Sequence, residues 1–196
     1  MLSHRYQGLH EPPRLAVLTG SLRPGRFGPV VGDWFVQQAR AFSGFDVGAV
    51  DLGDVVGEGP WHDPGDDPQW RDTVARADAF VVITPEYNHS YPGALKHAID
   101  SLNGEWHRKT VGFVSYGGLS GGRRAVEALR LVFAELYMVS VRETVSFHGG
   151  RACFDDSGTP NDREVAETAA RRMLGELGWW ARALRSARAE GLPLAS

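Results

Sequence analysis

Residues 15–35 read LAVLTGSLRPGRFGPVVGDWF, and this stretch decides how the rest of the chain is arranged. A short apolar run, 15–18, breaks into turn-forming residues, and a helical apolar pattern begins shortly afterwards. Gly28 and Pro29 suit the N-cap and the first position of that helix. The stretch therefore predicts a strand, a loop and a helix, in that order.

The predicted loop is suited to binding an anion. The N-terminus of a helix offers unpaired backbone N–H groups and a partial positive charge. Arg23 and Arg26 can add charge-assisted hydrogen bonds of about 1.5–3 kcal/mol each. The spacing matches neither the Walker A loop, which needs a Lys-Ser/Thr pair, nor G-x-G-x-x-G. A single terminal phosphate is therefore favoured over a pyrophosphate, and an ordinary solvated loop with two surface arginines is the alternative.

Length and charge narrow the class of protein. A chain of 196 residues suits one well-buried α/β domain, which we expect over 13–186, with a flexible arm at 1–12 and a tail at 187–196. The net charge of −3 is spread along the chain, so no footprint for nucleic acid or an anionic membrane is expected. Neither a secretion signal nor a membrane span is visible. Cys153 is the single cysteine, which excludes an intrachain disulfide and favours the cytoplasm.

Four further strands follow the first one. They are expected at 45–52, 79–84, 110–115 and 140–147, and the unbroken apolar run 79–84 is typical of a central parallel strand. Helices are expected at 69–77, from 93, after a cap at Ser120, and from 161, where Asn161 and Glu164 match a capping box. Residues 53–68 read as loop, and the His and Asp residues in it match no spacing of metal ligands.

The alternation of strands and helices predicts the fold. It indicates an α/β fold with a doubly wound five-stranded parallel sheet, order 2-1-3-4-5, and helices on both faces. Ligands of such sheets bind at the carboxyl ends of the strands, beside the switch between strands one and three. The unusual residues follow strands one, three and four, which is where such a site is expected.

Three motifs resemble those of one family. GSLRPGR after strand one, PEYNHSYPGALKHAIDSL after strand three and SYGGLSGGRRAVEALR after strand four are similar to the NADPH-dependent FMN reductase family, flavodoxin-like enzymes that include quinone, azo-dye and chromate reductases. The resemblance covers about 15–145. His97 and Gly28 depart from it, since many relatives carry Asn at the first position and some carry Asn or a larger residue near the second.

The resemblance implies FMN as cofactor, with NADPH or NADH as co-substrate and a small-molecule electron acceptor. The FMN phosphate would lie among Ser21, Arg23, Arg26, Phe27 and Gly28. Pro85, Glu86, Tyr87 and Asn88 would line the isoalloxazine and ribityl, and Tyr116, Gly117 and Gly118 would close over the pyrimidine side. No metal and no acid–base residue is expected, and relatives complete the site across a subunit interface, so we expect a homodimer or homotetramer.

Several of these residues have a second interpretation. Tyr87 and Tyr91 could simply pack within their loop, His89 could be a solvated histidine instead of a proton donor, and Glu86 could be a structural carboxylate that reaches a partner subunit. For the whole protein, the alternative is a non-enzymatic flavodoxin-like electron carrier or flavin-binding regulatory module. Such carriers usually have a hydroxyl-rich phosphate loop, so Arg23 and Arg26 favour an enzyme.

Overall fold

A computed structural model describes residues 11–56 and 63–191. Within these ranges a single parallel sheet has the strand order β2-β1-β3-β4-β5, as predicted. Its strands are β1 (Arg14–Thr19), β2 (Asp46–Asp51), β3 (Ala79–Pro85), β4 (Thr110–Gly117) and β5 (Val139–His148). β1 pairs in parallel with both β2 and β3, so the winding reverses at β1.

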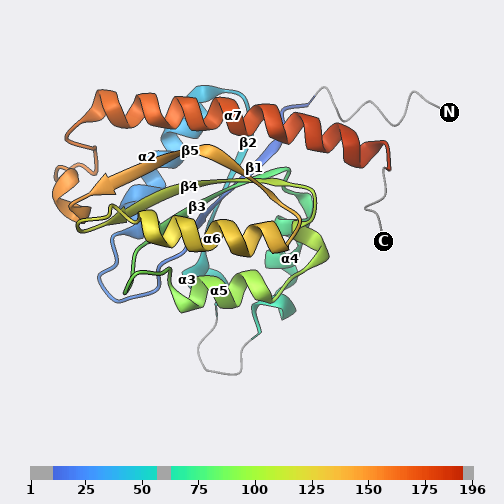
Figure 1. Ribbon diagram of the computed structural model, residues 1–196, viewed down its shortest axis with the longest axis horizontal. Helices are drawn as coiled ribbons and strands as arrows, with labels where there is room; N and C mark the ends of the chain where they lie inside the picture. Colours follow the sequence, from blue (N-terminus) through green and yellow to red (C-terminus); the bar gives the residue numbers. More distant parts are fainter. Residues whose placement is uncertain (1–10, 57–62, 192–196) are drawn as a thin grey trace.

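Helices cover both faces of the sheet (Figure 1). α2 (Gly28–Phe42) and α7 (Arg163–Ala189) pack on one face. The other face carries α3 (Leu52–Val55), α4 (Pro68–Arg76), α5 (Gly93–Asp100) and α6 (Arg123–Glu135). Short 3₁₀ turns lie at Pro64–Asp66, Gly104–Trp106 and Gly150–Cys153. Among the described residues, no helix combines the length and the apolar character that crossing a membrane requires.

The centre of the sheet is the apolar strand β3. Each of its residues is buried, because helices cover it from both sides. Its side chains alternate between two separate cores, with Val81 and Ile83 facing α2 and α7 and Phe80 and Val82 facing the other four helices. The loop that follows β3, and those that follow its neighbours β1 and β4, are thereby anchored on the buried centre of the sheet.

Two helix N-termini differ from the expectations. α2 is preceded by Phe27 as N-cap, one residue before the predicted Gly28. α7 is capped by Asp162, whose carboxylate accepts from the backbone N–H of Val165, in place of the predicted Asn161. Asn161 instead donates its side-chain amide to the carbonyl of Ala152. Neighbouring polar side chains compete for one cap, and loop geometry decides between them.

Two predicted boundaries are also corrected. Residues 53–68, expected to be loop, include most of the short helix α3, which Asp51 caps by accepting from the N–H of Gly53; 57–62 lie outside the described residues. α7 continues to Ala189, three residues into the expected tail. Arg188, near the end of α7, forms an ion pair with Asp78, the residue just before β3. Of the expected arm and tail, residues 1–10 and 192–196 lie outside the described ranges.

Candidate functional site

The predicted site residues meet at the carboxyl ends of β1, β3 and β4. Gly20, just after β1, donates its N–H to the carbonyl of Ile83 in β3 at 2.9 Å. Glu86, just after β3, donates its N–H to the carbonyl of Tyr116 in β4 at 3.1 Å. These bonds join the three motif-bearing segments beside the switch point, as expected for a doubly wound sheet.

A small cradle lies at the N-terminus of α2. Ser21 is fully buried, and its Oγ lies near enough to the Tyr116 hydroxyl to lower the pKa of Tyr116, but neither hydroxyl makes a well-formed hydrogen bond with the described residues. Both hydroxyls lie against Gly28, since a Cβ placed there would be 2.3 Å from Ser21 Oγ and 3.1 Å from the Tyr116 hydroxyl. No side chain caps α2. Buried polar groups without partners are costly, so this arrangement is suited to an acceptor-rich ligand such as a phosphate.

Aromatic packing holds the Tyr116 hydroxyl at the cradle. The ring of Phe27 meets that of Tyr116 edge-on, with centroids 5.9 Å apart. Burial raises the pKa of Tyr116 to about 12. The hydroxyl therefore stays protonated at neutral pH and can donate to an anion.

Arg26 takes a position that the sequence did not predict. Its Nη1 donates to both carboxylate oxygens of Asp51, at 2.7 and 2.8 Å, and to the carbonyl of Ser21 at 2.8 Å. The hydrogen bond with Asp51 raises the pKa of Arg26. Arg26 thus links the loop after β1 to the end of β2, and Asp51 is a site residue that sequence reasoning missed. Its position near the carboxyl end of the expected strand 45–52 was the available clue.

Arg23 lies over Tyr87. Its Cζ is 3.6 Å from the centroid of the Tyr87 ring, which is within the range of a cation–π contact. Arg23 is otherwise exposed. The guanidinium can therefore turn toward the cradle without breaking an ion pair with any of the described residues.

The segment after β3 forms a tight turn. Tyr87 and Ser90 exchange backbone hydrogen bonds of 2.8 and 3.0 Å. Asn88 and His89 between them both have positive φ angles, 51° and 68°, as the mirror-image turns of hairpins require. Asn adopts this conformation readily, whereas His does so at a cost. The turn keeps the Asn88 and His89 side chains exposed.

Glu86 points away from the sheet ends and toward α6. Its Oε2 accepts from Ser120 Oγ and from the N–H of Arg124, and its Oε1 accepts from Arg124 Nη1 at 2.9 Å. Burial alone would raise the pKa of Glu86, but the hydrogen bonds from Ser120 and Arg124 outweigh it and hold the pKa below its usual value. The Glu86 carboxylate therefore receives its hydrogen bonds from its own chain, whereas the sequence had suggested that it could contact a partner subunit.

The glycines after β4 are held from the side of β5. The N–H of Gly149 donates to the carbonyls of Gly117 and Gly118, at 2.9 and 3.0 Å. Ser115 and Ser146 both donate to the carbonyl of Gly121 at 2.8 Å. This loop is consequently well ordered, and a Cβ at Gly118 would meet nothing within 4 Å, so its backbone is open to a planar ligand.

The tyrosines expected to line an open slot have different environments. Tyr116 is buried, and Tyr91 packs partly against the core of α3–α6. Tyr87 is half-buried beneath Arg23. The packing interpretation therefore holds for Tyr91, and Tyr87 is the aromatic side chain left at the mouth of the site.

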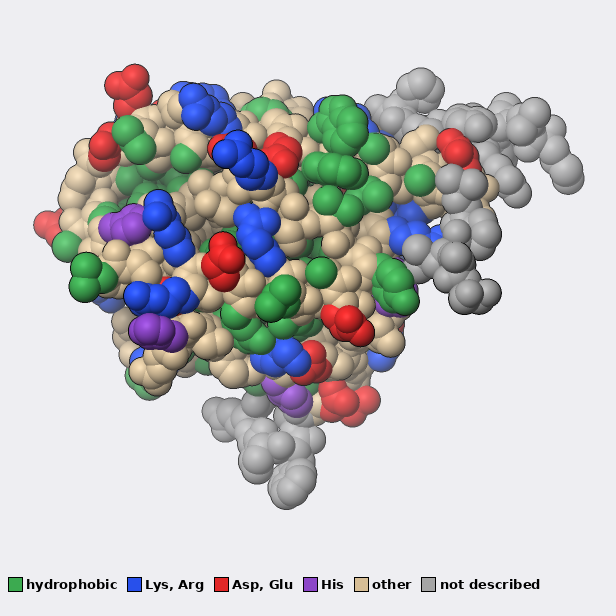
Figure 2. Space-filling view, in the orientation of Figure 1, with side chains coloured by type: hydrophobic (Ala, Val, Ile, Leu, Met, Phe, Trp, Pro, Cys, Tyr) green, Lys and Arg blue, Asp and Glu red, His purple; other side chains and the backbone are tan. Residues whose placement is uncertain are grey.

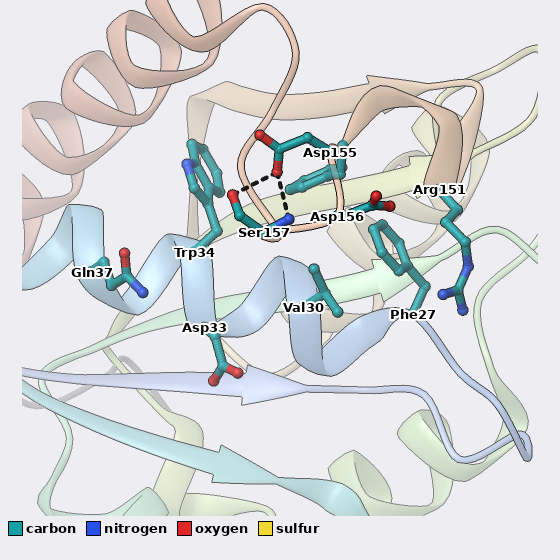
Figure 3. A pocket seen from close by; sticks show the side chains of 11 residues that line it. Phe27, Val30, Asp33, Trp34, Gln37, Arg151, Asp155, Asp156 and Ser157 are labelled. Atoms are coloured by element: carbon teal, nitrogen blue, oxygen red, sulfur yellow. Dashed lines mark hydrogen bonds between the residues drawn. The ribbon is translucent and has the colours of Figure 1, made fainter.

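A larger groove, about 430 Å³, lies beside this site (Figure 3). Val30, Asp33, Trp34 and Gln37 line it from α2, and Asp155 to Gly158 line it from the loop before α7. Phe27 separates the groove from the cradle, and Arg151 at its end donates to the carbonyl of Gly25 at 3.1 Å. Of the predicted site residues Phe27 alone lines this groove, so the groove is distinct from the predicted site.

Comparison with known proteins decides the family. The model of the family described as NADPH-dependent FMN reductase matches residues 13–152. The chain belongs to this family. The predicted fold, class of enzyme and cofactor are therefore confirmed: it is an FMN-dependent oxidoreductase with NAD(P)H as electron donor.

Individual relatives agree with the FMN reductase assignment. An NAD(P)H-dependent FMN reductase of Schizosaccharomyces pombe is 35% identical over 127 residues, which are 56% of this chain and 60% of that protein. A quinone reductase of Pseudomonas putida is 33% identical over 163 residues, 76% of this chain and 85% of that protein. Among solved structures, the flavoenzyme NAD(P)H:(acceptor) oxidoreductase FerB of Paracoccus denitrificans has a TM-score of 0.68 at 20% identity, covering 87% of this chain and 98% of its own.

The residues of this family member fit the phosphate of FMN. The cradle offers two buried hydroxyls without partners, an uncapped helix start and the space left by Gly28. A phosphate dianion would accept from the hydroxyls and from the start of α2.

The sequence did not indicate that Ser120 and Arg124 would donate hydrogen bonds to Glu86. Ser120 had been expected to cap α6 directly, but the N-cap residue of α6 is Gly122.

Proposed function

We propose that this FMN reductase family member transfers electrons from NAD(P)H to quinones and similar planar acceptors through bound FMN. The observation that carries the proposal is the cradle of Ser21, Tyr116 and Gly28 at the N-terminus of α2, because its unsatisfied donors match a phosphate monoester. FMN held there would supply the redox chemistry, namely hydride acceptance from the nicotinamide and transfer of two electrons to the acceptor.

The chain's own residues hold and orient the cofactor in this proposal. Arg23 and the cradle bind the phosphate, with Arg26 and Phe27 shaping the loop. Backbone groups of Pro85 to Asn88 lie along the ribityl and isoalloxazine. Gly117 and Gly118 let backbone N–H groups approach the pyrimidine side of the ring.

The proposal assigns no side chain as a dedicated acid, so selectivity for acceptors should be loose. Stacking discriminates between similar planar molecules by about 1–3 kcal/mol per small change of shape. Quinones, azo dyes and free flavin should therefore all be reduced at some rate. If donor and acceptor use the same face of the ring in turn, double-reciprocal plots give the parallel lines of a ping-pong mechanism.

Assembly as a homodimer or homotetramer is also part of the proposal, with α5 and the end of α6 at the interface. Leu131 and Tyr137 support it, since they are 76% and 57% exposed, whereas the neighbouring Trp106 and Met138 are buried in the core and are not available for an interface. Figure 2 shows apolar side chains interspersed with charged ones on the face formed by α6 and α7. Light scattering at micromolar concentration tests this, and a fully active monomer contradicts it.

A reducing compartment such as the cytoplasm is proposed from the single cysteine. Cys153 is half-buried, and its Sγ donates to the carbonyl of His148. A thiol that donates a hydrogen bond within its own chain does not require a disulfide partner.

Visible spectroscopy tests the proposed function. The purified protein loaded with FMN should show a flavin spectrum that bleaches when NADPH or NADH is added without oxygen, and colour should return on addition of a quinone. Turnover with several quinones supports an enzyme. Failure to bind FMN, or bleaching without multiple turnover of any small acceptor, overturns the proposal, and the second result favours the electron carrier.

A further inference from the structure

The carboxylate of Glu86 joins the loops that follow β3 and β4. Its backbone N–H bonds the end of β4, and its side chain accepts hydrogen bonds from Ser120 and twice from Arg124. These partners lie 34 and 38 residues further along the chain. One residue therefore ties together the two loops that would flank the flavin ring.

α6 depends on Glu86 for its cap. The N-cap residue of α6 is Gly122, with a φ of 86°, which has no side chain to satisfy the first N–H groups of the helix. Glu86 Oε2 accepts the N–H of Arg124, the second residue of the helix, at 3.2 Å. A carboxylate at this position also interacts favourably with the positive end of the helix dipole.

The charge of Glu86 is balanced where it lies. Its side chain is 9% exposed, and the Arg124 guanidinium pairs with it. The Arg124 side chain is 49% exposed, so water can compensate its charge when Glu86 is removed. The larger cost of losing Glu86 is that the Arg124 N–H and the Ser120 hydroxyl lose their common acceptor, which loosens the link between the two loops.

We propose that Glu86 is a positioning residue, whose side chain caps α6 and thereby fixes the distance between the loop after β3 and Gly117–Gly118. This rests on the proposed function, since it assigns the two loops to the flavin ring. The Glu86 carboxylate acts through Ser120 and Arg124 and not on the flavin, because its acceptor sites are directed at α6.

The proposal separates the ring side of the site from the phosphate side. The cradle at α2 has no hydrogen bond or ion pair with the Glu86 side chain among those of the described residues. Loss of Glu86 should therefore weaken FMN and riboflavin by the same factor. A change in the phosphate cradle should instead weaken FMN alone.

Titration of FMN and riboflavin into E86A and E86Q, followed by flavin fluorescence, tests the proposal. E86A should lose about tenfold or more in affinity for both flavins, because an uncapped helix and an unpaired Arg124 remain. E86Q keeps the shape but places an NH₂ group against the donors, so it should lose less. Hydrogen exchange of the apo proteins should show faster exchange at 117–124 in both variants.

Glu105→Gln is the matched control. Glu105 also pairs with an arginine, Arg71, and accepts a backbone N–H, that of Asn103, but it lies in the turn Gly104–Trp106. Its variant should leave both flavin affinities unchanged.

The outcomes distinguish the inference from the function on which it rests. If the wild-type protein binds no flavin, the proposed function is wrong. If it does, but E86A and E86Q bind both flavins as tightly as E105Q, or lose FMN alone, Glu86 does not position the ring-side loops. E86Q also covers the case in which E86A fails to fold. Faster exchange at 117–124 with unchanged flavin affinity would make Glu86 merely structural and overturn the inference.

Discussion

Asp51 holds Arg26 through both oxygens of its carboxylate, at 2.7 and 2.8 Å, from the end of the neighbouring strand. Arg26 in turn donates to the carbonyl of Ser21, the residue whose hydroxyl lines the cradle. The pair therefore braces the phosphate loop against β2. Of the two arginines expected to bind phosphate, Arg26 is paired with Asp51, whereas Arg23 forms no ion pair within residues 11–56 and 63–191.

Arg23→Ala tests the phosphate assignment. The variant should bind FMN more weakly by about 1.5–3 kcal/mol, because a charge-assisted hydrogen bond is lost. Riboflavin has no phosphate, so its affinity should change much less. Titrations with both flavins measure the difference, and equal losses would contradict a role at the phosphate.

The Arg26–Asp51 pair should show strong coupling. R26A and D51A should each lower the free energy of unfolding, since each leaves a half-buried charge alone, and the double variant should lose less than the sum, with a coupling energy of about 0.5–3 kcal/mol. Urea unfolding of the apo proteins measures the cycle. The exposed Lys96–Asp100 pair is the control, with about 0.3–0.5 kcal/mol expected. Additive effects at Arg26 and Asp51 would show that the ion pair contributes nothing to the free energy of unfolding.

Gly28→Ala should block the cradle. Its Cβ would lie 2.3 Å from Ser21 Oγ, so the hydroxyl must move out of the space that a phosphate would use. We expect FMN to bind about tenfold more weakly or worse, equivalent to about 1.4 kcal/mol, with little effect on riboflavin. Gly175→Ala in α7, where a Cβ meets nothing within 4 Å, is the control and should stabilise the fold by up to about 1 kcal/mol. Unchanged FMN affinity in G28A would place the phosphate elsewhere.

His89 tests whether the turn after β3 has only a conformational role. His89→Gly should raise the free energy of unfolding by about 1 kcal/mol, because glycine adopts the positive φ of 68° without strain. His89→Ala should leave turnover nearly unchanged, since protons for a reduced quinone can come from water. Thermal unfolding and steady-state kinetics measure the two effects. A loss of several orders of magnitude in turnover, with FMN still bound, would identify His89 as a general acid.

Lys109 should make the free energy of unfolding vary with pH in the alkaline range. Its Nζ donates to the carbonyls of Val74 and Ala75 at the end of α4, and burial lowers its pKa to about 8. Between pH 8 and about 10.4 the unfolded chain therefore binds more protons at this residue than the folded protein does. Stability should rise with pH in that window, by no more than about 1.4 kcal/mol per pH unit. Denaturant unfolding at several pH values should show a smaller slope for K109M, and identical slopes would exclude Lys109 as the cause.

Local patterns were sufficient for the architecture and for the location of the site. The apolar run of β3, the alternation of elements and the breaks after β1, β3 and β4 are properties of neighbouring residues, so they can be recognised without coordinates. The strand order followed from these together with general rules of chain winding. The loops that carry the candidate site likewise followed from the carboxyl ends of these parallel strands. The roles of Ser21, Gly28 and Tyr116 came from the family resemblance, which had placed Tyr116 at the pyrimidine side of the ring, whereas the structure brings its hydroxyl beside Gly28.

What the sequence by itself determined was which elements form and which loops carry the chemistry, because side-chain periodicity and turn propensity act over a few residues. The tertiary structure alone decided which partner each charged side chain takes: Arg26 pairs with Asp51, 25 residues away, and Glu86 caps a helix 38 residues away. These choices depend on how far apart the ends of β2, β1, β3 and β4 lie and on which rotamers reach across the gaps. No pattern along the chain carries that information.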